Sequence, residues 1–140
     1  MSDVEFEVYP DEVFEWQYTE AEVTPETATF VGIAATGKVD GILAMYVHMF
    51  STAYNTRVVP VKRKGWNACD ALLDMIRDIE DGEDVAEKKA VFNLYAADEG
   101  KTYGQVIFRY ILERAGDERY KFKIAWKVVG VRGDEEEGVA

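Results

Sequence analysis

Residues 119–129, RYKFKIAWKVV, alternate between charged and apolar side chains almost without exception. Cations have one parity in this stretch, and large apolar residues have the other. The cations are Arg119, Lys121, Lys123 and Lys127, and the apolar residues are Tyr120, Phe122, Ile124, Trp126 and Val128. Because successive side chains of a β-strand point to opposite faces, this pattern predicts a strand with one buried and one exposed face.

The composition is that of an acidic chain with enough apolar material for a hydrophobic core. The 140 residues carry a net charge of −11 at pH 7, and 48% of them are hydrophobic. This length predicts one compact domain over residues 1–132, followed by a short acidic tail over 133–140. The net charge argues against a general polyanion binder, because affinity for nucleic acid rests largely on neutralising phosphates.

The charge is unevenly distributed along the chain. Residues 1–50 hold one basic and ten acidic side chains, whereas residues 101–132 hold eight basic and three acidic ones. The N-terminal segment 3–8 has an acidic row at two-residue spacing, made of Asp3, Glu5 and Glu7. Opposite charges facing each other across two strands contribute roughly 0.2–1 kcal/mol per pair. We therefore expect residues 3–8 to lie beside residues 119–127 and to neutralise their cations.

Alternation and turn residues predict several more strands. Residues 3–8 and 13–19 are expected to form an N-terminal hairpin around the turn at Tyr9 to Glu12, followed by a loop over 20–27. Further strands are predicted at 29–35, at 56–61 with Pro60 marking a sheet edge, and at 90–95.

Two segments fit both helical and extended spacing. Residues 42–52 follow a glycine-rich turn at 37–41, and we favour a strand over a helix for them. Residues 103–115 are rich in strand formers, and the turn at 115–118 favours a hairpin with the strand at 119–129 over a helix.

One helix is predicted clearly, at about 67–81. Asn67 is a good N-cap, apolar residues from Ala68 to Ile79 follow helical spacing, and Gly82 closes the segment. The predicted fold is therefore α+β and β-rich. Its antiparallel strands form a sandwich or a partly open barrel with this one central helix.

No residue pattern points to catalysis, a metal or a cofactor. The chain has one cysteine, Cys69, and one histidine, His48, which excludes a Cys/His zinc site by count. A general base needs a nucleophile or an orienting partner within reach, and no such motif accompanies His48. We therefore expect a protein that is not an enzyme and has no cofactor.

The sequence predicts a cytoplasmic protein, in the host cytoplasm or the virion if it is viral, and not a secreted one. Its acidic N-terminus lacks the basic-then-apolar pattern of a signal peptide. The apolar run at 41–50 is too short to span a bilayer, so no membrane partner is expected.

The leading functional hypothesis is a protein–protein binding or assembly module whose partner is another protein or copies of itself. A viral or phage structural subunit, or a small phage-encoded inhibitor of a host protein, would have this composition. The alternative is a single-stranded nucleic-acid-binding protein with an OB-like order of elements and an acidic C-terminal tail. The candidate contact residues are Arg57, Lys62, Arg63, Lys64, Trp66, Asp70, Asp74, Asp78, Tyr103, Arg109 and Tyr110.

The parity of residues 119–128 favours the first hypothesis. Single-strand binders combine cations and stacking aromatics on one surface. In this stretch the aromatic residues have the opposite parity from the cations, so we expect them in the core.

Overall fold

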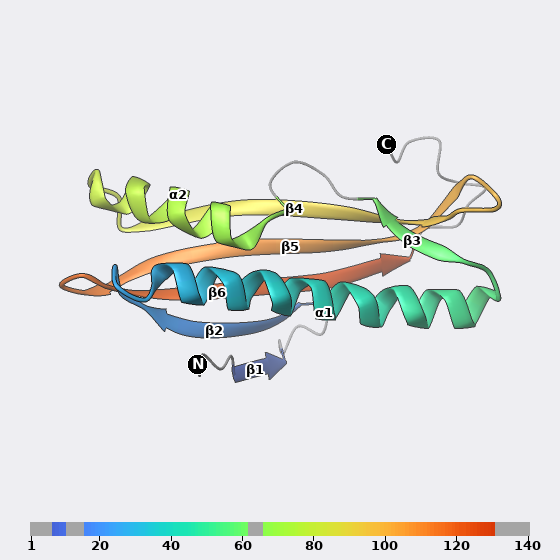
Figure 1. The fold of residues 1–140 in the computed structure, drawn as a ribbon, viewed down its shortest axis with the longest axis horizontal. Coiled ribbons are helices and arrows are strands. Elements are labelled where there is room, and N and C mark those ends of the chain that lie inside the picture. The colour runs from blue at the N-terminus through green and yellow to red at the C-terminus, as the bar shows by residue number, and fades with distance from the viewer. Residues whose placement is uncertain (1–6, 11–15, 62–65, 131–140) are drawn as a thin grey trace.

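The chain forms one antiparallel sheet of six strands with two helices on one of its faces (Figure 1). This computed structural model describes residues 7–10, 16–61 and 66–130. The strands are β1 (Glu7–Pro10), β2 (Gln17–Val23), β3 (Val58–Val61), β4 (Val85–Ala96), β5 (Lys101–Gly116) and β6 (Arg119–Gly130), and the helices are α1 (Ala28–Tyr54) and α2 (Ala68–Glu80). The strand order is β1-β2-β6-β5-β4-β3. The predicted α+β, β-rich class with an antiparallel sheet that is not closed is confirmed.

Strand β6 lies inside the sheet, and the alternation of its sequence matches its two faces. The apolar set from Tyr120 to Trp126 is buried against the helices, whereas Arg119 and Lys121 are exposed on the opposite face. Strand β5 alternates in the same way and pairs with β6 over almost its whole length. The predicted hairpin of residues 103–115 with residues 119–129 is confirmed.

The neighbour of β6 on its other side is β2, not the segment at 3–8. The expected pairing of 3–8 with 119–127 is wrong for residues 7–8, which pair with β2, and residues 3–6 lie outside the described part. The reason is the hairpin itself, because β2 is inserted between β1 and β6 and leaves β1 at the sheet edge.

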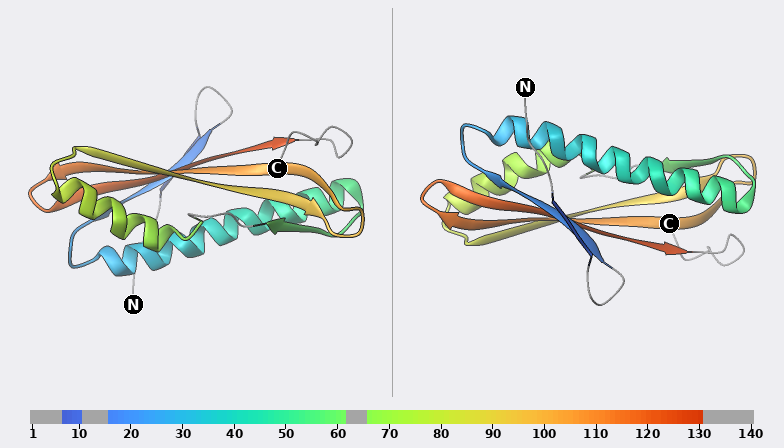
Figure 2. Two further views of the ribbon diagram at one scale, coloured as in Figure 1. Left: turned by 90° about the horizontal axis from the view of Figure 1, so that it is seen from above. Right: turned by 90° about the horizontal axis from the view of Figure 1, so that it is seen from below.

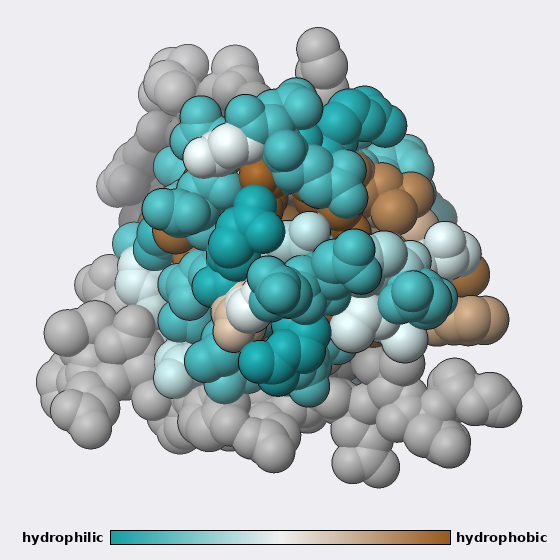
Figure 3. Space-filling model, turned by 90° about the vertical axis from the view of Figure 1, so that its left-hand side faces the viewer, coloured by the Kyte–Doolittle hydropathy of each residue, from teal (hydrophilic) through white to brown (hydrophobic). Residues whose placement is uncertain are grey.

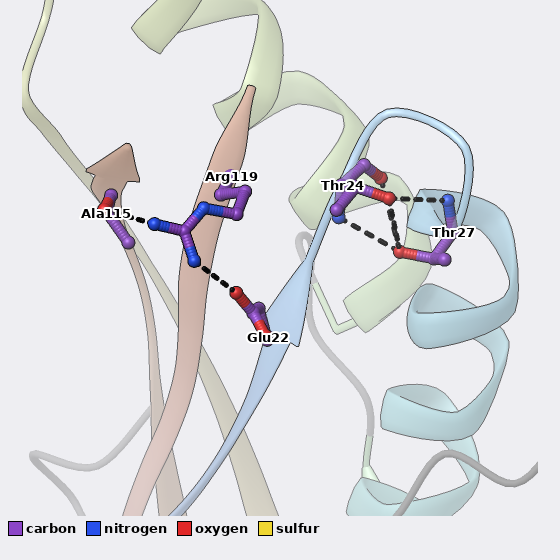
Figure 4. Close-up of polar contacts among 5 residues, drawn as sticks. All are labelled: Glu22, Thr24, Thr27, Ala115 and Arg119. Carbon is purple, nitrogen blue, oxygen red and sulfur yellow. Dashed lines mark hydrogen bonds and ion pairs between the residues drawn. The ribbon is translucent and has the colours of Figure 1, made fainter. Parts of the chain in front are cut away.

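The charge pairing that we expected from residues 3–8 is provided by β2. Glu20 lies opposite Lys123, and Glu22 lies opposite Lys121. Glu22 Oε2 also forms an ion pair with Arg119 Nη1 at 3.2 Å, drawn in Figure 4. Strand β2 extends to Val23, so the predicted loop over 20–27 is wrong for its first four residues.

The largest difference from prediction is α1. The strand expected at 29–35, the turn at 37–41 and the strand at 42–52 are all part of one 27-residue helix. The helix follows a turn in which the backbone N–H of Thr24 donates to Thr27 Oγ1 at 2.9 Å (Figure 4). The helix ends at Tyr54, and its C-cap is Asn55, whose φ of 51° is the left-handed conformation that closes many helices.

Helical spacing in α1 places small and branched apolar residues against the rest of the protein. The buried residues are Ala28, Val31, Gly32, Ala35, Val39, Ile42, Leu43 and Tyr46. Figure 2 shows both helices on one side of the sheet and no helix on the other. This packing overrides the low helix propensity of the glycines, since tertiary contacts supply most helical stability in proteins.

The remaining elements agree with the sequence more closely. Helix α2 has the predicted bounds within one residue, and Asn67 Oδ1 accepts hydrogen bonds from the backbone N–H groups of Cys69 and Asp70 at 2.9 and 3.1 Å. Strand β3 is an edge strand that contains Pro60, as predicted. Strand β4 is confirmed but begins at Val85, five residues before the predicted start.

Candidate binding surfaces

The outward face of α1 carries exposed apolar side chains along the whole helix. We term this surface the α1 stripe, made of Phe30, Ile33, Gly37, Gly41, Met45 and Met49. Phe30 and Ile33 are 60% and 61% exposed, and Met45 and Met49 are 47% and 52% exposed. The members are three or four residues apart, and each four-residue step turns about 40° around the helix, so the stripe winds across about half of the surface of α1.

The α1 stripe stands out because the helix bears almost no charge. Among its 27 residues, Lys38 and Asp40 are the only Lys, Arg, Asp or Glu. Of the nine large apolar side chains exposed in the described part of the chain, five belong to α1. Contiguous exposed apolar surface of this kind marks interaction sites in soluble proteins.

The middle of the α1 stripe is a notch. A Cβ atom added at Gly37 or at Gly41 would meet no other atom within 4 Å. The longer side chains of Ile33 and Met45 stand on either side of these glycines along the helix. The surface is therefore low at its centre and raised towards both ends.

A cavity of ≈ 480 Å³ lies beside the α1 stripe, between α1 and the edge strand β3. Its walls are mainly apolar and come from Asp40, Leu43, Ala44, Val47, His48, Ser51 and Pro60. Ala44 and His48 are exposed next to the stripe, so the cavity widens the apolar surface towards the sheet edge.

Helix α1 is also long and apolar enough to cross a membrane, by length and composition alone. The sequence argument that the apolar run at 41–50 is too short to span a bilayer therefore does not apply to this 27-residue helix. The core helix of a soluble protein passes the same test, and α1 packs its inner face into the core of this protein.

The sheet face without helices carries a second surface. We term it the cation–aromatic cluster, made of Trp16, Tyr18, Arg109, Lys123 and Lys127. The Trp16 ring centre lies 5.4 Å from Arg109 Cζ and 5.0 Å from Lys127 Nζ, and the Tyr18 ring centre lies 4.4 Å from Lys123 Nζ. These are cation–π distances. Cations of β5 and β6 therefore do share a face with aromatic rings, which come from β2 and the residue before it.

Acidic neighbours compensate part of this cationic charge. Arg109 Nε donates to Glu87 Oε2 at 2.7 Å, and this hydrogen bond holds the pKa of the Glu87 carboxyl below its usual value. Glu20 lies opposite Lys123 on the neighbouring strand. The cluster is therefore a mixed surface of rings, cations and carboxylates.

The aromatic candidates named from the sequence do not form one exposed surface. Tyr110 is buried on the helix side of the sheet, and its hydroxyl donates to the Trp66 carbonyl at 2.8 Å. Burial raises the pKa of Tyr110 above its usual value. Trp66 packs against the core, whereas Tyr103 bonds to Glu99 and lies 4.6 Å from the Tyr54 ring. Only Arg109 belongs to the cation–aromatic cluster.

The charged candidates are also dispersed. Asp70, Asp74 and Asp78 are exposed along α2, and Asp74 pairs with Arg77 at 3.5 Å. Arg57 is exposed after α1, on the way to β3. Lys62, Arg63 and Lys64 lie outside the described residues. Across residues 16–61 and 66–130 no group of three or more His, Cys, Asp or Glu side chains is placed to hold a metal ion.

Both surfaces were missed from the sequence for identifiable reasons. The alternation of residues 13–19 already placed Trp16 and Tyr18 on one face, but the strand beside β6 was not known. The α1 stripe has no clear signal in the sequence, because the glycines of 28–54 give this segment the pattern of strands and turns. Comparisons with protein-family models, curated proteins and solved structures find no match, so function is argued from these surfaces.

Proposed function

We propose that this protein is a non-enzymatic protein–protein binding and assembly module, and that the α1 stripe is its binding surface. The observation that carries the proposal is the exposure of Phe30, Ile33, Met45 and Met49 on a nearly uncharged helix. Full burial of a large apolar side chain stabilises a protein or complex by roughly 1.5–3 kcal/mol relative to leaving that side chain in water. A partner that covers the stripe recovers part of that free energy.

The charge of the whole chain supports a localised binding surface. A net charge of −11 keeps the protein soluble despite the apolar stripe, because like-charged molecules repel each other. Figure 3 shows that one end of the molecule is mostly hydrophilic, with hydrophobic residues reaching the surface towards one side. A subunit of a viral or phage assembly, or a small inhibitor of a host protein, is the setting we propose for such a module.

Site-specific photo-cross-linking tests the binding surface directly. The photoreactive residue p-benzoylphenylalanine is placed at Met49 in the full chain, which is then irradiated in an extract of its source cells. We expect protein adducts, because the partner must lie within reach of that side chain. The same residue at Leu73, which is exposed on α2, is the matched control.

The outcome separates a binding surface from a merely exposed one. Adducts at Met49 that are absent at Leu73 support the proposal. Equal labelling at both positions, or no protein adduct at Met49, would show that the α1 stripe has no protein partner.

Single-stranded nucleic acid binding is the second candidate, and the cation–aromatic cluster is the observation that favours it. Base stacking on aromatic rings combined with cations is the usual chemistry of such binding. Oligo-dT should then quench tryptophan fluorescence in the full chain but not in Trp16→Leu. Phosphate contacts predict a marked loss of affinity between low and high salt. No quenching at low salt would eliminate this candidate.

A further inference from the structure

We propose that the partner of the α1 stripe is α1 of a second copy of this chain, packed antiparallel with Gly41 at the crossing point. The proposal rests on the proposed function, since it names the partner of the same surface. It is carried by the charge of α1, by the order of large and small residues along the stripe, and by the notch at its centre.

Charge restricts where two copies can meet. Each copy has a net charge of −11, so most pairs of faces would bring carboxylates together. Helix α1 carries one cation and one anion, Lys38 and Asp40, and is therefore neutral. Two copies that meet along the α1 stripe therefore bring together helices without net charge and cover exposed apolar side chains.

The stripe is complementary to its own reverse. Four residues before Gly41 stands Gly37, and four residues after it stands Met45. Eight residues before it stands Ile33, and eight residues after it stands Met49. In an antiparallel pair centred on Gly41, each Met45 therefore faces the Gly37 notch of the other copy, and each Ile33 lies level with a Met49.

A parallel pair would fit less well. It would set Met45 against Met45 and Gly37 against Gly37, so the large residues would collide while the notch stayed empty. The antiparallel pair fills the notch twice, as a two-fold interface requires. It also places opposite ends of the two helix dipoles side by side.

The dimensions predict a modest affinity. A helix of 27 residues is about 40 Å long and presents a strip about 10 Å wide. Two such strips bury roughly 800 Å² in total, which is below the area of stable specific interfaces and within the range of weak, transient ones. We expect a dimer that dissociates on dilution and that strengthens as salt screens the repulsion between the two acidic copies.

Analytical ultracentrifugation of the purified full chain tests the dimer. The mass should rise from 15.9 kDa towards twice that value with increasing concentration. Gly41→Leu should raise the dissociation constant of the dimer roughly tenfold or more, because the leucine side chain fills the crossing point. The variant should fold normally, since the space around the Gly41 Cβ position is open in the single chain.

Gly130→Leu is the matched control, because it makes the same chemical change at an exposed and open position at the end of β6, outside α1. It should leave the dissociation constant unchanged. A monomer at every concentration and salt would overturn the proposal of a second copy. Adducts from Met49 to a different protein would then leave the proposed function standing, and vesicle binding by the monomer would point to a membrane instead.

Disulfide trapping tests the antiparallel arrangement in a Cys69→Ser background. Disulfides need Cα atoms about 4.4–6.8 Å apart. Gly41→Cys should oxidise to a covalent dimer on its own. Gly37→Cys should not link to itself but should link to Met45→Cys when the two variants are mixed, because each position lies only about 40° around α1 from Gly41. Self-linking of Gly37→Cys without the mixed product would overturn the antiparallel arrangement.

Discussion

Phe122→Ala is expected to lower the free energy of unfolding by about 3–5 kcal/mol, the usual cost of removing a buried phenylalanine ring. Phe122 is fully buried on β6, and its ring centre lies 6.3 Å from that of Tyr110. It faces the helices from the inside of the sheet, so β2 and β5 on either side limit the collapse of the cavity. Urea denaturation at low protein concentration measures the loss.

Lys121→Ala is the matched control on the same strand. Lys121 is exposed on the opposite sheet face, where Glu22 and Glu113 are its neighbours across the strands. Losing these surface pairs should cost at most about 1 kcal/mol. Similar losses for the two variants would mean that the alternation of β6 does not separate a buried face from an exposed one.

Gly32→Ala is expected to destabilise the protein by about 1–3 kcal/mol, as overpacking of a tight contact does. An added Cβ would lie 2.6 Å from Cys69 Sγ and 3.0 Å from Cys69 Cα, so α1 and the start of α2 would have to separate. Thermal or urea unfolding measures the loss. The backbone contact matters most, because a side chain can rotate away but Cα cannot.

Gly37→Ala makes the same chemical change five residues later on the same helix. Position 37 is open, so alanine should stabilise the helix by up to about 1 kcal/mol through its higher propensity. The two variants should therefore move stability in opposite directions. A loss at both positions would show that α1 requires flexible glycines rather than close packing at Gly32.

Two glycines within α1 explain why the sequence does not predict this helix. Gly37 and Gly41 lie within a segment of otherwise apolar residues, and Lys38-Val39-Asp40 between them has the composition of a turn. Two glycines cost a helix about 2 kcal/mol relative to alanine. Burial of the inner face against the sheet offsets that cost, and local sequence contains no measure of it.

The position of β2 was equally non-local. Residues 119–127 predicted an acidic neighbour, and the neighbour is indeed acidic, but Glu20 and Glu22 supply the carboxylates. Pairing energy is similar for any strand with carboxylates at two-residue spacing. Which acidic segment lies beside β6 depends on the β1–β2 hairpin, which places β2 between β1 and β6.

By itself, the sequence determined the buried and exposed faces of β6, the caps and bounds of α2, and the edge position of β3. These features depend on side-chain period and on backbone chemistry within a few residues. Only the tertiary structure decided that 28–54 is one helix, that Trp16 and Tyr18 lie over the cations of β5 and β6, and that the α1 stripe is exposed. These features depend on contacts between segments far apart in the chain, whose free energy no local pattern records.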